Sequence, residues 1–221
     1  MKEDNTKENV RELILRTALE QFTSRGIKDV KMDDIASMLS ISKRTIYELF
    51  NDKEQLLFEA LKLHNEKILQ EGKLIVRKAS HTLEIILNLY DKYVDILSNI
   101  NKKFFTDLKK YPDICKSKRH NEEQNDKKFV AWIEMGRKEG LFREDANLEI
   151  FSYILRQNLE TIFTVNMDSE KNELSKFPTR ELGRTLIVFY LRGISTPKGQ
   201  EIIENYLKEN NKINTSYNYE S

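Results

Sequence analysis

Only seven glycines and three prolines interrupt this chain of 221 residues. A fold built from many short strands needs turn residues between them, and glycine and proline are the residues that turns most often require. The chain is instead rich in Leu, Ile, Lys and Glu, most of which favour helices. This shortage of turn residues predicts an all-α fold.

Apolar residues recur at three- and four-residue spacing along most of the chain, which is the pattern of helices with one buried face. In the first predicted helix, for example, Ile14, Ala18 and Phe22 lie on one side. Helices are predicted over residues 6–24, 32–39, 43–50, 53–70, 81–100, 102–112, 120–138, 146–166, 178–193 and 197–210. The polar residues 211–221 are predicted to form a flexible tail.

The sequence also carries information about the compartment. The single cysteine, Cys115, cannot form a disulfide within the chain, which favours a reducing environment. The charged start of the chain is not followed by the apolar segment of a secretory signal. The longest apolar run, residues 186–191, is far too short to span a membrane. We therefore expect a cytoplasmic protein with no membrane partner.

The overall charge gives no support to nucleic-acid binding. The formal net charge is +1, and the first 56 residues hold ten Lys and Arg against eleven Asp and Glu. A DNA-binding hypothesis therefore depends on where the charges lie rather than on their sum.

Residues 25–57 nevertheless have the pattern of a DNA reader. Two short predicted helices are separated by the turn at residues 40–42, and each has an apolar inner face. The second helix places Lys43, Arg44, Thr45 and Tyr47 near its start, with no acid before Glu48. The major groove of B-DNA is about 12 Å wide and admits one helix, whose first residues contact the bases. The sequence therefore predicts a three-helix DNA-binding domain with a helix-turn-helix over residues 1–53.

Each polar residue of the second helix fits a role in DNA contact. Lys43 and Arg44 can reach guanine acceptors or phosphates, Thr45 can touch a thymine methyl group, and Tyr47 can donate to a phosphate. Lys53 begins the next helix, where backbone N–H groups and the helix dipole favour a phosphate. Lys43 could equally contact a phosphate without reading a base. Lys53 could instead be a solvated lysine that makes no DNA contact. The seven predicted DNA contacts are Lys31, Ser42, Lys43, Arg44, Thr45, Tyr47 and Lys53.

The order of residues through this segment resembles the DNA-binding domain of the TetR (tetracycline repressor-like) transcriptional regulators. The matching positions are Gly26, Ile27, Met32, Ile35, Ala36, Ile41, Ser42, Lys43, Thr45, Ile46, Tyr47, Phe50, Lys53 and Leu56. Lys31 stands where the family commonly has a Thr or Ser N-cap, and its charge could replace the missing phosphate contact. Ser40 stands where a turn glycine is common, and serine tolerates turns through local hydrogen bonds.

The resemblance implies a second domain, over residues 54–210, that is a helical bundle, dimerises and encloses a ligand pocket. The sequence agrees in outline, since Glu139-Gly140-Leu141-Phe142-Arg143 resembles the family's link between its seventh and eighth helices. A repressor that is released from DNA by a small molecule is the function that this resemblance implies.

Two late helices are candidates for the dimer interface. The predicted helices 146–166 and 178–193 have wider apolar arcs than one packed face requires. A two-fold four-helix bundle built from them would form a homodimer, although a plain internal core would give the same pattern. The candidate interface residues are Phe151, Leu155, Leu159, Ile162, Leu182, Leu186, Phe189 and Tyr190.

Aromatic residues of the middle helices are the candidates for the ligand pocket. They favour an apolar or amphipathic organic ligand over a metal or a phosphate ester. Aromatic residues at helical spacing can also be ordinary core. The candidates are Tyr90, Tyr93, Phe104, Phe105, Phe129 and Trp132.

We find no pattern that indicates an enzyme. His64, His81 and His120 are dispersed, and no group of His, Cys and acidic residues has metal-ligand spacing. Phosphate-binding glycine motifs and the nucleophile motif GxSxG are missing from the sequence. We therefore expect no catalytic residues, no metal and no cofactor.

The leading hypothesis is a TetR-like repressor that binds palindromic double-stranded operator DNA as a homodimer and is released by a small apolar or amphipathic ligand. The strongest alternative is an all-helical adaptor or scaffold dimer that does not bind DNA, and a helical enzyme is the third. The run from Lys43 to Tyr47 discriminates the first two, because an adaptor would more often present an apolar face there.

Overall fold

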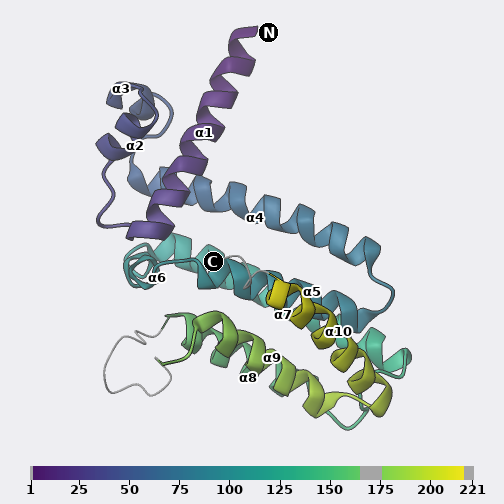
Figure 1. The fold of residues 1–221 in the computed structure, drawn as a ribbon. Helices are drawn as coiled ribbons and strands as arrows, with labels where there is room; N and C mark the ends of the chain where they lie inside the picture. Colours follow the sequence, from purple (N-terminus) through teal and green to yellow (C-terminus); the bar gives the residue numbers. More distant parts are fainter. Residues whose placement is uncertain (1, 165–175, 217–221) are drawn as a thin grey trace. The chain divides into compact units, whose positions relative to one another are not determined.

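The computed structural model describes residues 2–164 and 176–216, and within them the chain is helical (Figure 1). The helices are α1 (Lys2–Arg25), α2 (Met32–Met38), α3 (Lys43–Tyr47), α4 (Lys53–Lys78), α5 (Thr82–Ser98), α6 (Lys102–Leu108), α7 (Pro112–Lys138), α8 (Leu148–Thr164), α9 (Thr179–Ile194) and α10 (Pro197–Ser216). Extended pairing in these ranges is limited to an isolated antiparallel bridge between Phe142 and Ser195. The all-α prediction is confirmed. None of the helices in the described ranges has the length and apolar character needed to cross a membrane.

Three helices extend furthest beyond their predicted ranges. Helix α4 continues through Gly72 to Lys78, because one glycine costs a helix only about 1 kcal/mol. Helix α7 begins at Pro112, since proline is tolerated in the first turn, where its missing N–H would have no partner. Helix α10 continues to Ser216, so residues 211–216 of the predicted tail are helical. Residues 217–221 lie outside the described residues.

The chain divides into two compact units, and the division differs from the predicted boundary after residue 53. Unit 1 is Met1–Lys73 with Asn99–His120, and unit 2 is Leu74–Ser98 with Asn121–Ser221. Helix α6 belongs to unit 1 because it is hydrogen-bonded to the end of α1 and to the loop that follows. The Asn101 N–H donates to the Thr23 carbonyl over 2.7 Å. The Lys28 N–H donates to the Asp107 carboxylate, also over 2.7 Å.

Unit 1 places α2 and α3 beside α1 (Figure 1). Fully buried side chains come from each of the first four helices and from the residues that join them. They are Ile14, Ala18, Phe22, Ile27, Ile35, Ile46, Phe50, Leu56 and Leu57. The turn after α1 depends on Gly26, whose φ of +94° is in the region that favours glycine. A Cβ at this position would lie 2.9 Å from the Lys103 Cβ, so α6 also packs too closely to admit a larger residue.

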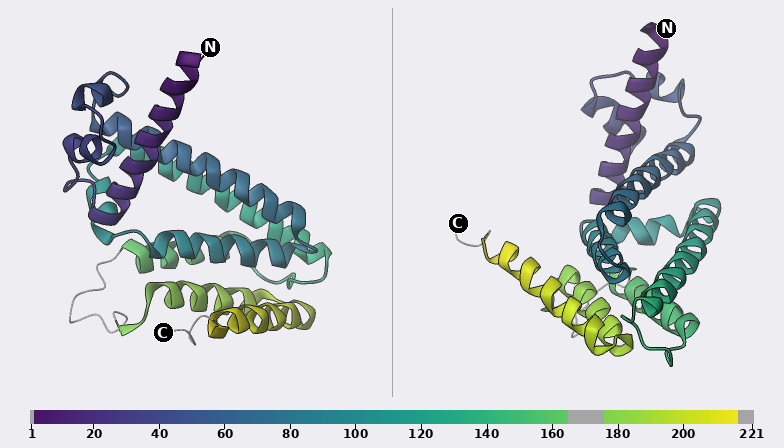
Figure 2. Two further views of the ribbon diagram at one scale, coloured as in Figure 1. Left: turned by 45° about the horizontal axis from the view of Figure 1, so that its top comes forward. Right: turned by 90° about the vertical axis from the view of Figure 1, so that its right-hand side faces the viewer.

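Unit 2 is a bundle in which α8 and α9 lie side by side (Figure 2). Its core includes Leu83, Ile86 and Val94 of α5, Phe129 and Ile133 of α7, Leu155 and Leu159 of α8, Ile187 and Leu191 of α9, and Ile203 of α10. The link between α7 and α8 is held against the link between α9 and α10. The Arg143 N–H donates to the Ile194 carbonyl over 2.8 Å, and the Thr196 N–H donates to the Leu141 carbonyl over 3.0 Å.

Candidate nucleic-acid interface

The turn between α2 and α3 is tight and hydrogen-bonded. Ser40 has a φ of +54°, which is the left-handed conformation that favours glycine. The next residue returns to α2, because the Ile41 N–H donates to the Ala36 carbonyl over 3.0 Å. The turn therefore has the conformation that a glycine usually supplies, and serine adopts it here.

Helix α3 begins with a serine cap. Ser42 has an extended backbone, and its hydroxyl accepts a hydrogen bond from the Thr45 N–H over 3.0 Å. The two hydroxyls, Ser42 Oγ and Thr45 Oγ1, are also within 2.8 Å of each other. On the opposite side of the helix, Ile46 is fully buried. This cap and this anchor fix the direction in which the first residues of α3 face solvent, as a helix in the major groove requires.

Among the predicted reading residues, Lys43, Arg44 and Tyr47 are exposed and Thr45 is half-buried, and the two cations are paired with acids. The Lys43 ammonium lies 2.8 Å from the Asp33 carboxylate of α2, and this hydrogen bond raises the pKa of Lys43. The Arg44 guanidinium lies 2.9 Å from the carboxylate of Glu48, four residues further along. Tyr47 is exposed, with its ring available to solvent. Asp33 and Lys43 are ten residues apart and on different helices, so local sequence patterns do not indicate this bond.

Lys53, for which the sequence predicts a phosphate contact, is hydrogen-bonded within unit 1. Its ammonium donates to the carbonyls of Ile27 and Val30 in the loop between α1 and α2. It also lies 5.7 Å from the centre of the Phe22 ring. Burial lowers the pKa of Lys53. An ammonium bound to two carbonyls holds the loop between α1 and α2 in place.

Lys31 is exposed at the start of α2, as a phosphate contact requires. Its backbone N–H donates to the Asp34 carboxylate over 2.9 Å. Asp34 thus supplies the half of a capping box that accepts from the N-cap N–H, a bond that does not depend on a Thr or Ser hydroxyl.

The six aromatic residues predicted to form one ligand pocket are divided between the two units. Phe104 and Phe105 lie on α6 in unit 1, where they pack edge to face with ring centroids 5.6 Å apart. The other four, Tyr90, Tyr93, Phe129 and Trp132, belong to unit 2. Phe104 and Phe105 are in unit 1 because the chain folds α6 against α1.

Unit 2 contains a continuous row of four aromatic rings from different helices. Their contacts were not predicted from the sequence. Tyr90 meets Phe129 edge to face at 5.4 Å, and Phe129 stacks on Phe151 at 5.9 Å. Phe151 in turn meets Tyr190 edge to face at 5.6 Å. Two predicted pocket residues and two predicted interface residues therefore form one continuous set inside the unit.

The eight residues predicted to form the dimer interface differ in exposure. Phe151, Leu155 and Leu159 are buried in the core of unit 2. Ile162, Leu182, Leu186 and Tyr190 are partly buried, and Phe189 is 66% exposed. The side of α8 that faces solvent is formed by three residues that the sequence analysis did not select, Ile150, Tyr153 and Ile154. These three residues also have helical spacing, so α8 is apolar on two sides. The sequence alone does not indicate which of the two sides packs into the core of unit 2.

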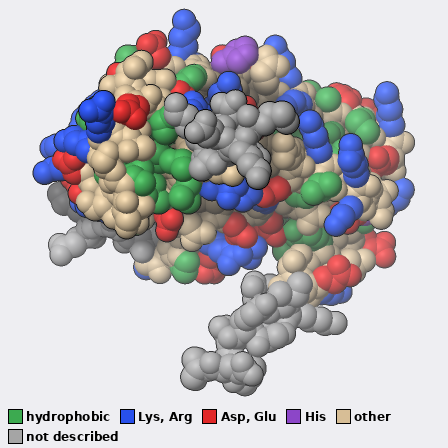
Figure 3. Space-filling view, turned by 90° about the horizontal axis from the view of Figure 1, so that it is seen from above, with side chains coloured by type: hydrophobic (Ala, Val, Ile, Leu, Met, Phe, Trp, Pro, Cys, Tyr) green, Lys and Arg blue, Asp and Glu red, His purple; other side chains and the backbone are tan. Residues whose placement is uncertain are grey.

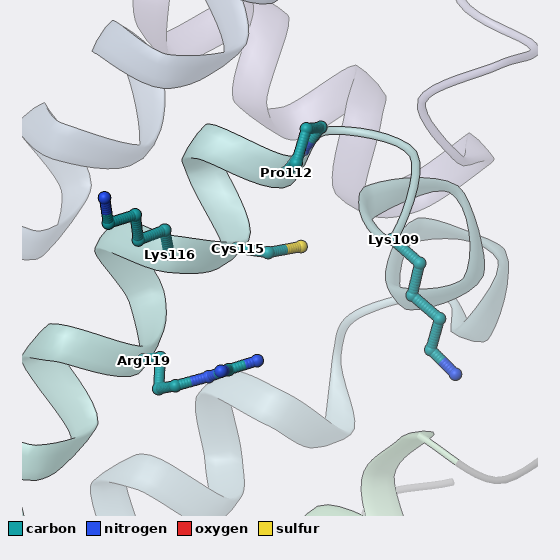
Figure 4. A pocket seen from close by; sticks show the side chains of 5 residues that line it. All are labelled: Lys109, Pro112, Cys115, Lys116 and Arg119. Carbon is teal, nitrogen blue, oxygen red and sulfur yellow. The ribbon is translucent and has the colours of Figure 1, made fainter.

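Unit 1 has an open hollow where α6 is followed by α7 (Figure 4). In the close view Cys115 and Arg119 extend from the same side of α7, while Lys116 points away. The Cys115 thiol donates to the Leu108 carbonyl over 3.2 Å. The predicted pocket aromatics do not line this hollow, whose wall is formed by Lys109, Pro112, Cys115, Lys116 and Arg119. In the described parts of the chain, His, Cys, Asp and Glu side chains form no group of three that could hold a metal ion.

These features define a class of protein. A buried three-helix core carries a short helix whose capped start exposes Lys43, Arg44 and Tyr47, which is the arrangement of helix-turn-helix DNA-binding proteins. Residues 14–60 match the family model described as bacterial regulatory proteins, tetR family. This part of the chain is therefore similar to the DNA-binding domain of the TetR transcriptional regulators.

Relatives and solved structures agree with this assignment. The chain is 23% identical over 197 residues to the HTH-type transcriptional repressor KstR2 of Mycolicibacterium smegmatis, covering 86% of this chain and 93% of that protein. A TetR transcriptional regulator from Chloroflexus aurantiacus has a TM-score of 0.66 at 17% identity, covering 86% of this chain and 98% of that one. A transcriptional regulator from Saccharomonospora viridis, solved in complex with choline, has a TM-score of 0.64 at 21% identity, with 86% and 99% covered. None of these comparisons supports an adaptor that lacks DNA binding.

Proposed function

We propose that this protein is a homodimeric repressor that binds a two-fold symmetric operator and is released from it by a small organic ligand. The observation that carries the proposal is the start of α3, where Lys43, Arg44 and Tyr47 face solvent while Ile46 anchors the opposite side. Arg44 is the main base-reading candidate, because its side chain is 87% exposed and guanidinium groups bind guanine in a bidentate manner.

The homodimer is supported by an apolar surface on α8 and α9, which we call the outer α8–α9 face. It consists of Ile150, Tyr153, Ile154 and Phe189, all of which are exposed. Such clustered exposed apolar side chains mark interaction sites in soluble proteins. A second copy placed on this face by a two-fold axis would form a four-helix bundle. Two readers could then enter successive major grooves, which are about 34 Å apart.

Release by a ligand requires an element that both units share. Helix α4 begins at Lys53, beside the reader, and passes from unit 1 into unit 2 at Lys73. Helix α7 also passes from one unit to the other, so α4 is one of two such helices. A ligand shifts the positions of these helices only if it binds the DNA-binding and the released conformations with different affinities. To reverse the populations of the two conformations from 1:99 to 99:1, the binding free energies must differ by about 5.5 kcal/mol.

The class of ligand is inferred from unit 2 and from relatives. The row of Tyr90, Phe129, Phe151 and Tyr190 offers ring faces to an apolar or amphipathic molecule. A similar protein was solved with choline, and another, the KstR2 of Mycobacterium tuberculosis, is described as a ketosteroid transcriptional regulator. Small organic molecules of these two kinds are the first to test.

Selection of bound duplexes from a random DNA pool tests the proposal. We expect a palindromic consensus, since a two-fold dimer presents two identical readers. On the selected duplex, Arg44→Ala should cost about 1–3 kcal/mol of binding free energy, whereas Tyr47→Phe should weaken binding equally on selected and scrambled DNA. If neither substitution changes the affinity for the selected duplex, α3 is not the reading helix.

A further inference from the structure

We propose that Asp33 and Glu48 are specificity-determining residues, which hold Lys43 and Arg44 away from DNA phosphates until base acceptors take the place of their carboxylates. This inference rests on the proposed reading role of α3. It assigns a function to two acids that contribute nothing attractive to a negatively charged partner.

The geometry places each acid beside one reading cation. The Asp33 carboxylate comes from the first turn of α2 and reaches across to the Lys43 ammonium at 2.8 Å. Glu48 ends α3 and binds the Arg44 guanidinium at 2.9 Å. All four side chains are more than half exposed to solvent. Both pairs therefore lie on the surface that a DNA duplex would approach, rather than in the core.

The charge of the reader gives the reason for such pairs. Non-specific DNA binding comes almost entirely from cations that neutralise phosphates and release counterions. The first 56 residues hold ten Lys and Arg against eleven Asp and Glu. Over the face drawn in Figure 3, acidic and basic side chains are interspersed and form no broad area of one sign. A reader of this kind has little general attraction to DNA.

The strengths of the competing contacts allow the exchange. An exposed ion pair changes an equilibrium by roughly five-fold or less, so each carboxylate is displaced at small cost. A good bidentate base contact discriminates by roughly 5- to 150-fold. At a correct base, the contact with the base stabilises the cation more than the lost ion pair with its acid did. At a phosphate the gain is offset by the lost carboxylate and by repulsion between that carboxylate and the DNA.

The test compares Asp33→Asn with the unmodified protein on two duplexes, the one recovered by selection and a scrambled duplex of the same length and composition. Freeing Lys43 adds one phosphate contact on scrambled DNA, so the slope of log K against log salt should steepen by about 0.9. With that slope, the tenfold change from 1 M to 0.1 M salt corresponds to a gain of about eight-fold in affinity. On the selected duplex the slope should stay unchanged, because Lys43 already contacts a base there.

Two further variants make the result specific to the pair. Lys43→Ala in the Asp33→Asn background should remove the gain on scrambled DNA, which a general loss of negative charge would not do. Glu66→Gln removes the same charge from an exposed position on α4 and should leave the slope unchanged. Glu48→Gln should reproduce the effect of Asp33→Asn through Arg44. Thermal unfolding verifies that each variant is folded.

An unchanged slope on scrambled DNA, or an equal steepening on both duplexes, would overturn the inference. A gain that survives Lys43→Ala would do the same. Failure of the proposed function looks different, since then Lys43→Ala and Arg44→Ala in the otherwise unmodified protein would leave binding to the selected duplex intact.

Discussion

Ser40 shows how one residue can depart from a family pattern while the fold is kept. Its φ of +54° is a left-handed conformation, and a residue with a Cβ occupies it at a cost of about 1–3 kcal/mol. The hydrogen bond from Ile41 to Ala36 fixes the chain on the far side of the turn. The reader therefore carries local strain at the position that orients α3.

Relief of this strain is the first prediction. Ser40→Gly should raise the free energy of unfolding by about 1 kcal/mol, which is the relieved strain less the extra freedom of glycine in the unfolded chain. Ser37→Gly, inside α2, is the matched control and should lower stability by about 1 kcal/mol. Urea denaturation followed by circular dichroism measures both. A destabilising Ser40→Gly would mean that the side chain contributes more than its backbone conformation costs.

Lys53 shows a second effect at the scale of the residue. In the sequence it is a lysine in the first turn of a helix, and a phosphate contact is the natural expectation. In the structure its ammonium binds the carbonyls of Ile27 and Val30. Carbonyls of a loop need donors when the neighbouring chain excludes water, and a flexible lysine stem can supply one. The role of such a lysine depends on the direction that the surrounding residues allow its side chain to take.

At the scale of the element, α6 is the helix whose position the sequence did not reveal. It is short, and its apolar residues include Phe104 and Phe105, which suggested a pocket. Its polar residues determine its place, because Asn101 and Asp107 bind the backbone at the end of α1 and in the following loop. The loop that leads to the reader is thus held by Lys53 of α4 on one side and by Asp107 of α6 on the other.

The Asp107 contact predicts a pH-dependent stability. Burial raises the pKa of Asp107, but the hydrogen bonds from the Lys28 N–H and from Lys110 outweigh it, so the pKa is lowered overall. A carboxyl group whose pKa is lowered by folding stabilises the protein above its unfolded pKa, near 4, and this stabilisation is lost as the pH falls. Asp107→Asn should therefore cost about 1–3 kcal/mol at pH 7.

The difference in unfolding free energy between the unmodified protein and Asp107→Asn should shrink as the pH is lowered below about 4. Urea titrations at several pH values between 3 and 7 measure it. Asp113→Asn, at an exposed position at the start of α7, is the control for the loss of one charge. A difference that stays constant over this range would mean that the Asp107 charge does not hold α6.

At the scale of the whole molecule, the proposed homodimer depends on the outer α8–α9 face. Phe189→Glu places a charge at a side chain that is 66% exposed, so the protomer should stay folded while the dimer dissociates. Light scattering should then give the mass of one chain, and binding to the selected duplex should be lost.

Two comparisons make this assembly prediction specific. Leu69→Glu, at an exposed apolar residue of α4, should leave the dimer intact. Leu155→Glu should instead unfold unit 2, since Leu155 is only 1% exposed and a buried unpaired charge costs several kcal/mol. A Phe189→Glu variant that remains dimeric and binds DNA would place the interface elsewhere.

The proposed release mechanism makes a prediction about the complete protein. By thermodynamic linkage, operator DNA must weaken the binding of the effector by the same factor by which the effector weakens the binding of DNA. Screening small organic molecules for an increase in unfolding temperature identifies the effector, and calorimetry with and without the selected duplex measures the factor. Equal effector affinities in the two titrations would leave a regulator whose second unit serves for dimerisation only.

The sequence by itself determined the helical class, the approximate helices and the helix-turn-helix. These features depend on residues close together in the chain. The spacing of Ile41, Ile46 and Phe50 sets one side of α3, and the cap at Ser42 sets its start. Local patterns of this kind have the same meaning whatever the rest of the chain does, which is why the reader could be placed within a few residues.

Only the tertiary structure decided which side of an apolar helix is buried and which polar side chains meet. Leu155 and Ile154 are neighbours in sequence, but one lies in the core of unit 2 and the other is exposed. Lys43 and Asp33 are ten residues apart, and Asp107 and Lys28 are 79 apart. Such contacts depend on how separate helices pack, and neither helical periodicity nor capping contains that information, because both describe one helix at a time.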